Sequence, residues 1–234
     1  MMRCYAARSE HMTLGGVPCT VAKPDFDAPL LIYYHGWSSY PDEQGLRLMT
    51  LAGAGYTVIA PCADLHGERG KVDYDKPEVI AEVFFRAIRT HLKEFDALKA
   101  AARKLIPDGP AFLYGNSMGG MTAYHLLERE DFAAAVITNS TPFTRKWADY
   151  VEEEFLEGLP MEGVLEDTDF PTRTPLYAMG GDADPVVPQK DVREALEPQE
   201  KYLNFPDLAH YVTAVMMNQT VDFFDKHLKG GCHE

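Results

Sequence analysis

The chain has 234 residues, of which 46% are hydrophobic and 25% are charged, and its formal net charge is −14 at pH 7. This length and apolar share suit one α/β domain with a large core. The strong negative charge argues against nucleic acids and anionic membranes as partners.

The sequence contains few features that indicate a cellular compartment or a cofactor. No apolar run reaches the length of a membrane span, and the pattern of a signal peptide is absent. The four cysteines are scattered without metal or redox spacing, which is typical of reduced thiols in a cytoplasmic protein. The chain has no P-loop, no dinucleotide-binding glycine pattern and no H-E-x-x-H, so we expect neither a cofactor nor a metal.

Apolar strand-like runs alternate along the chain with segments of helical periodicity. This alternation predicts parallel crossovers, with helices covering both faces of a mostly parallel central sheet. In chain order, we expect strands at residues 2–7, 17–23, 30–34, 56–61, 111–114, 133–138, 175–179 and 201–205. We expect helices at residues 41–54, 77–105, 117–129, 190–196 and 211–228.

Two early strands are followed directly by polar loops. The continuous apolar run at residues 30–34, typical of a buried strand, leads into His35-Gly36-Trp37-Ser38. The strand at residues 56–61 leads into the charged loop 64–70, which contains His66, Glu68 and Arg69. In open α/β sheets, sites form just beyond the carboxyl ends of strands.

A G-x-S-x-G pentapeptide at residues 115–119 follows the strand at residues 111–114 and precedes a helix. A strand-to-helix turn this sharp crowds the backbone, so the flanking positions need residues without a Cβ. The serine between them projects from the top of the sheet. Ser117 is therefore the candidate nucleophile.

Roughly thirty residues separate the strand at 133–138 from the next strand, which is longer than an ordinary connection. Its large apolar residues recur at helical spacing: Phe143, Trp147, Tyr150, Val151, Phe155 and Leu156. Two interpretations stay open for residues 141–172. The segment is either a small cap over the site or an amphipathic helix packed on the core.

Two later strands supply the groups that a serine nucleophile needs. A serine hydroxyl requires a base within hydrogen-bond reach and a third group that orients this base. The strand at 175–179 leads into a turn with Asp182 and Asp184, and the strand at 201–205 leads into a loop with His210. Asp182 is expected to be a turn-forming residue.

With Ser117, Asp184 and His210 in this order, the chain resembles the α/β-hydrolases. The G-x-x-D-x-x-V-P turn at residues 181–188 is similar to the acid loop of single-domain esterases related to dienelactone hydrolases and to the catalytic domain of prolyl oligopeptidases. The resemblance covers nearly the whole chain. It implies one α/β-hydrolase domain over residues 1–234, with Asp184 as the acid.

The resemblance also implies the remaining site residues. The backbone N–H groups of Trp37 and Met118 are expected to form the oxyanion hole, with His35 bracing the loop from beneath. The loop at 64–70 is expected to form a site wall, although Glu68 and Arg69 equally fit a charged surface loop. Candidate substrate contacts are His66 in this loop and Trp147 in the cap segment.

The resulting hypothesis is a serine hydrolase that cleaves small carboxylic esters. A thioesterase or a small peptidase would use the same groups. A binding protein that kept the fold without its chemistry is the alternative from another class. The expected partner is a small-molecule ester.

Overall fold

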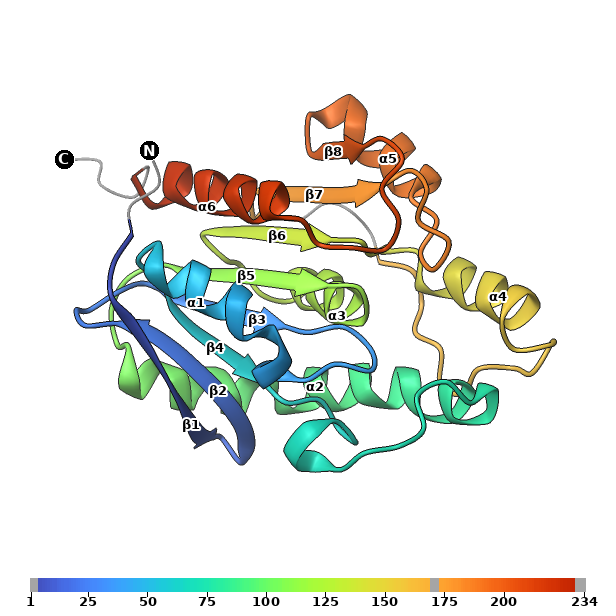
Figure 1. Ribbon diagram of the computed structural model, residues 1–234, viewed down its shortest axis with the longest axis horizontal. Helices are drawn as coiled ribbons and strands as arrows, with labels where there is room; N and C mark the ends of the chain where they lie inside the picture. Colours follow the sequence, from blue (N-terminus) through green and yellow to red (C-terminus); the bar gives the residue numbers. More distant parts are fainter. Residues whose placement is uncertain (1–3, 169–172, 230–234) are drawn as a thin grey trace.

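The computed structural model describes residues 4–168 and 173–229, which form a central sheet between two layers of helices (Figure 1). Its strand order is β1-β2-β4-β3-β5-β6-β7-β8. The pairs β1–β2 and β2–β4 are antiparallel, and every other neighbouring pair is parallel. The strands are β1 (Ala7–Leu14), β2 (Val17–Pro24), β3 (Leu30–Tyr34), β4 (Thr57–Pro61), β5 (Ala111–Asn116), β6 (Ala134–Thr138), β7 (Leu176–Gly181) and β8 (Tyr202–Phe205).

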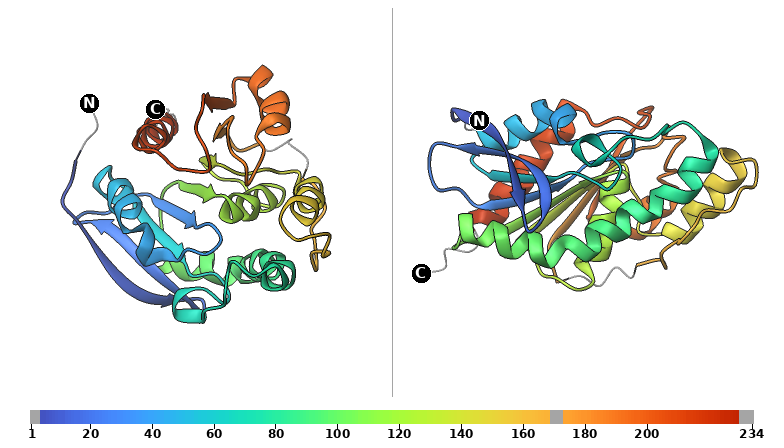
Figure 2. Two further views of the ribbon diagram at one scale, coloured as in Figure 1. Left: turned by 45° about the vertical axis from the view of Figure 1, so that its right-hand side comes forward. Right: turned by 90° about the horizontal axis from the view of Figure 1, so that it is seen from below.

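The helices pack on both faces of this sheet, as the views in Figure 2 show. Residues of α1 and α6 belong to one core cluster, whereas α2, α3 and α5 contribute to the cluster on the opposite face. The predicted mostly parallel α/β sheet is therefore confirmed. The helices are α1 (Gly45–Gly53), α2 (Pro77–Leu105), α3 (Met118–Leu127), α4 (Thr144–Glu154), α5 (Lys190–Leu196) and α6 (Ala214–Lys229).

The run of apolar residues in β3 reflects burial on both faces of the sheet. Successive side chains of a strand point to opposite faces. Leu30, Ile32 and Tyr34 accordingly lie in one core cluster, and Leu31 and Tyr33 lie in the other. Every residue of β3 is fully buried, so this strand has no polar alternation. Such a strand holds the loop that follows it in a fixed place.

Three boundaries differ from the expectations. The strand predicted at residues 2–7 is wrong, because β1 begins at Ala7 and continues to Leu14; residues 1–3 lie outside the described part. β1 is an edge strand with an exposed polar face, so its apolar pattern is weak. The helix predicted at 41–54 begins as a 3-10 turn over Pro41–Gln44, and the last helix begins at Ala214 rather than Tyr211.

The longest helix, α2, is not suited to a membrane. Over residues 4–168 and 173–229, every helix is too short or too polar to cross a bilayer. α2 instead packs along the sheet and contributes buried residues such as Phe85 and Phe95 to the core.

Candidate active site

Ser117 occupies the turn between β5 and α3 in a strained backbone conformation. Its φ is 54° and its ψ is −121°, which a non-glycine residue adopts only when the surroundings enforce it. The neighbouring glycines explain how the turn closes. A Cβ on Gly115 would lie 2.4 Å from the carbonyl oxygen of Gly119, and a Cβ on Gly119 would lie 2.2 Å from the carbonyl oxygen of Tyr34. Both glycines are therefore required by close backbone approach.

The side chains of Ser117, His210 and Asp184 form a continuous hydrogen-bonded chain. Nε2 of His210 lies 2.9 Å from Oγ of Ser117, and Nδ1 of His210 lies 2.6 Å from Oδ2 of Asp184. The three residues come from the loops or turns after β5, β8 and β7. The side chain of His210 is 22% exposed, so solvent reaches the base while the carboxylate beneath it is fully buried.

The two aspartates of the acid turn have different surroundings. Oδ1 of Asp184 accepts hydrogen bonds of 2.9 Å from the backbone N–H groups of Val186 and Val187, which leaves Oδ2 for His210. Asp182 is exposed, and a hydrogen bond from the Asn204 side chain lowers the pKa of its carboxyl. Asp182 also accepts the N–H of Asp207, so it ties the acid turn to the loop after β8.

The loop after β3 lies against the serine turn. A Cβ on Gly36 would lie 3.3 Å from Cβ of Ser117 and 3.2 Å from Nδ2 of Asn116. Trp37 directly follows Gly36 in the chain, and its indole N–H donates a hydrogen bond to the carbonyl of Tyr74. Within the described residues, the backbone N–H groups of Trp37 and Met118 make no hydrogen bond to a protein acceptor. An oxyanion hole formed by these two N–H groups stays a prediction.

His35 is buried completely under this loop. Its Nε2 accepts the backbone N–H of Ala63, and its Nδ1 lies 2.8 Å from the carbonyl oxygen of Gly36. This pair of partners places the proton on Nδ1. Burial lowers the pKa of His35 to about 3, so the ring is neutral at ordinary pH. The expected bracing of the loop by His35 agrees with these contacts.

The loop after β4 holds its charged residues in ion pairs. Arg69 forms two hydrogen bonds of 2.8 Å with the carboxylate of Glu94. Glu68 lies 2.8 Å from Nδ1 of His11. Both charges therefore have structural partners, and the loop packs against α2 and β1.

The two candidate substrate contacts lie in packed aromatic surroundings. His66 is fully buried and stacks on Tyr74, and its ring centroid lies 5.1 Å from that of Trp37 in a T-shaped arrangement. Trp147 is 6% exposed and packs on Phe84 with 4.6 Å between ring centroids. A substrate contact by either residue stays a prediction.

The segment predicted as a cap contains α4. Trp147 belongs to the core cluster that includes Met118, and together with Tyr150 it lines a cavity of about 140 Å³ beside Pro188. Phe155, expected on the same apolar face, directly follows the end of α4 and is 46% exposed. Residues 169–172 lie outside the described part, and a cap over 141–172 stays a prediction.

The structure adds residues that local sequence patterns do not reveal. Ser140 Oγ donates to the carbonyl of Ser117 and supports the strained turn from the end of β6. Trp147 Nε1 and the Tyr150 hydroxyl donate to backbone carbonyls of the acid turn. These contacts join segments distant in sequence, and only the position of Ser140, two residues after a buried strand, gives a hint of its place.

Metal binding has no candidate ligand set in the described chain. Among residues 4–168 and 173–229, no group of three or more histidine, cysteine, aspartate or glutamate side chains is arranged to hold an ion. The groups that Ser117, His210 and Asp184 bring together are a hydroxyl, an imidazole and a buried carboxylate.

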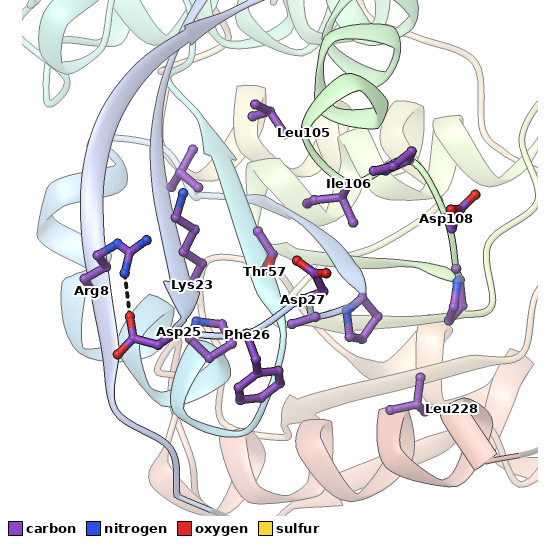
Figure 3. Close-up of a pocket in the computed structure, with 17 residues that line it drawn as sticks. Arg8, Lys23, Asp25, Phe26, Asp27, Thr57, Leu105, Ile106, Asp108 and Leu228 are labelled. Atoms are coloured by element: carbon purple, nitrogen blue, oxygen red, sulfur yellow. Dashed lines mark hydrogen bonds and ion pairs between the residues drawn. The ribbon is translucent and has the colours of Figure 1, made fainter.

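A cleft of about 520 Å³ lies at the opposite end of the sheet (Figure 3). It is lined by Pro29 and Pro110, which precede β3 and β5, and by Thr57 at the start of β4. Arg8 on its rim pairs with Asp25. The residues of the candidate active site follow the other ends of the strands, so this cleft is separate from them.

The chain belongs to the alpha/beta hydrolase family, because residues 30–221 match the model of that family. A Bacillus subtilis (strain 168) protein with the name "Putative esterase YitV" is 25% identical over 253 aligned residues, which cover 94% of this chain and 98% of that protein.

Solved structures share the fold over nearly the whole chain. The crystal structure of TT1662 from Thermus thermophilus has a TM-score of 0.71 at 20% identity, covering 96% of this chain and 99% of that one. A structure titled "Putative Dienelactone Hydrolase" from Klebsiella pneumoniae has a TM-score of 0.66 at 19% identity, covering 97% and 95%. The predicted α/β-hydrolase fold is confirmed by these comparisons.

Proposed function

We propose that this member of the alpha/beta hydrolase family cleaves small carboxylic esters through an acyl-enzyme intermediate on Ser117. The hydrogen-bonded chain from Ser117 through His210 to Asp184 carries the proposal. The esterase name of the Bacillus subtilis relative supports the choice of ester.

In the first half of the reaction, Nε2 of His210 takes the proton of the Ser117 hydroxyl as its oxygen attacks the ester carbonyl. Asp184 keeps the other ring proton on Nδ1 and stabilises the imidazolium. The N–H groups of Trp37 and Met118 hold the negative oxygen of the tetrahedral intermediate. Collapse of this intermediate releases the alcohol, which takes a proton from His210.

In the second half, water attacks the acyl group on Ser117 with His210 again as the base. A second tetrahedral intermediate forms at the same N–H groups, and its collapse returns the proton to Ser117 and releases the acid. His210 is half-buried, so water reaches the base without a large rearrangement.

The proposal is tested with a fluorophosphonate probe on the wild-type protein and on Ser117→Ala. We expect the wild-type protein alone to be labelled, with the label on Ser117. A panel of p-nitrophenyl esters and acyl-CoA thioesters of graded chain length then ranks the substrate classes. An unlabelled wild-type protein without turnover on any substrate would favour a binding protein, and faster turnover of thioesters would favour a thioesterase.

A further inference from the structure

We propose that α4 holds the acid turn in place, with Trp147 and Tyr150 as positioning residues for Asp184. The inference rests on the proposed function, because it concerns the same Ser117–His210–Asp184 chain. In this arrangement the segment between β6 and β7 acts on the reaction through the geometry of the acid, and substrate contact is not needed for that effect.

Two hydrogen bonds connect α4 to the acid turn. The indole N–H of Trp147 donates to the carbonyl of Val186 over 2.9 Å, and the hydroxyl of Tyr150 donates to the carbonyl of Pro185 over 2.7 Å. These carbonyls belong to the two residues that directly follow Asp184. Figure 1 shows α4 beyond the carboxyl ends of β6 and β7, beside the loop that follows β7.

The same short stretch of backbone holds the carboxylate of Asp184. The N–H groups of Val186 and Val187 donate to its Oδ1. The peptide unit between Pro185 and Val186 therefore accepts a hydrogen bond from the Tyr150 hydroxyl at its oxygen and donates one from its N–H group to Asp184. A hydrogen bond at one end of a peptide unit polarises the other end, so the two contacts reinforce each other.

Packing prevents α4 from moving independently of the core. Trp147 stacks on Phe84 of α2 and shares a buried cluster with Val187 of the acid turn. Lys146 pairs with Asp191 of α5 over 2.7 Å, which adds a second link beyond the turn. The views in Figure 2 place α4 beside the start of α2. The helix is thus a rigid support against which the acid turn rests.

This support has a specific consequence for the reaction. A carboxylate that shifts away from His210 stabilises the imidazolium less, so the transition state loses stabilisation. Loss of the support therefore lowers kcat. In Tyr150→Phe we expect KM and the ester-length preference to stay near the wild-type values, since the aromatic ring is kept.

Tyr150→Phe is the primary test, because it removes one hydroxyl and keeps the ring. We expect kcat to fall about 3- to 10-fold, with KM near the wild-type value. Tyr56→Phe is the matched control, since it removes a hydroxyl that donates to Asp225 over 2.8 Å on the other face of the sheet. The control should retain the wild-type kcat.

The variant Trp147→Phe/Tyr150→Phe removes both donors and should lower kcat about 10- to 100-fold. An unchanged kcat in folded Tyr150→Phe overturns the proposal, and so does a change confined to KM or ester preference. Fluorophosphonate labelling of Ser117 separates the two hypotheses. A wild-type protein that is not labelled refutes the proposed function, whereas a labelled wild type whose variants react at the same rate refutes only the role of α4.

Discussion

The backbone N–H of Ala63 donates a hydrogen bond of 3.1 Å to Nε2 of His35, which joins the loop after β4 to the loop beside Ser117. A protonated ring cannot accept this hydrogen bond. The link between the two loops therefore depends on a neutral His35.

Because this link requires a neutral His35, we expect the stability of the protein to fall in acid. Burial lowers the pKa of His35 to about 3, while a histidine in the unfolded chain titrates near about pH 6.5. Between these values the unfolded state binds more protons, so stability falls as pH drops, by about 1.4 kcal/mol per pH unit per histidine. Burial lowers the pKa of His66 and His91 in the same direction. Urea unfolding between pH 7.5 and 5 measures this slope.

His35→Gln provides the matching variant, because its amide oxygen can still accept the N–H of Ala63. We expect its unfolding free energy to depend on pH less steeply than in the wild-type protein, by about one proton. An equal slope in both proteins would mean that His35 does not contribute to the acid sensitivity.

Ser117→Ala and His210→Ala should each lower kcat by about as much as the double variant, on the order of 10⁴ to 10⁶. The reason is that each residue is useless for nucleophilic attack without the other. Steady-state kinetics on freshly separated, contamination-free preparations measure the three values. Additive losses would show that the two side chains act in separate steps.

Asp184→Asn should lower kcat by about 10³ to 10⁴. Oδ1 accepts two backbone N–H groups, so the new amide nitrogen must face Nδ1 of His210. The ring then carries its proton on Nε2, where it cannot accept the proton of Ser117. Asp182→Asn is the control two residues away, and its kcat should stay near that of the wild type. The reverse ranking would transfer the role of the acid to Asp182.

The local pattern was sufficient to predict elements whose signals lie in adjacent residues. The helix expected at 77–105 is observed as Pro77–Leu105, because proline suits the first helical turn and the apolar residues repeat at helical spacing. The edge strand β1 was misplaced, since only one of its faces is covered.

The candidate active site likewise has parts that the sequence predicts and parts that it does not. The turn at Ser117 could be predicted, because its glycines are needed within five consecutive residues. The hydrogen bond from Tyr150 to Pro185 spans 35 positions in the chain, and the bond from Trp147 to Val186 spans 39. Periodicity places these residues on a helix face, but it contains no information about which loop that face meets. Contacts of this kind follow from tertiary packing.

Gly119→Ala should destabilise the protein by about 1 to 3 kcal/mol or more, because its Cβ would lie 2.2 Å from a backbone oxygen of β3. Gly45→Ala is the opposite case. Gly45 has helical φ and ψ, and a Cβ added to it would meet open space, so the substitution should stabilise the protein by about 0.4 to 1 kcal/mol. Urea unfolding curves of both variants measure these changes. A stable Gly119→Ala protein would contradict the close approach of β3 and α3.

Trp147→Ala should lower the unfolding free energy by about 3 to 5 kcal/mol, as expected for truncation of a buried aromatic residue. Trp147 is 6% exposed, packs on Phe84 and Phe85, and loses its hydrogen bond to Val186 in this variant.

The ester-length profile of the same protein tests the predicted substrate contact separately. If Trp147 forms a wall of the acyl pocket, the truncated protein should accept longer acyl chains, because the wall is removed. Trp147→Phe keeps most of the ring surface and serves as the control, with a smaller loss of stability and the original chain-length preference. An unaltered profile in a destabilised Trp147→Ala protein would limit this residue to packing and positioning and would end the cap interpretation.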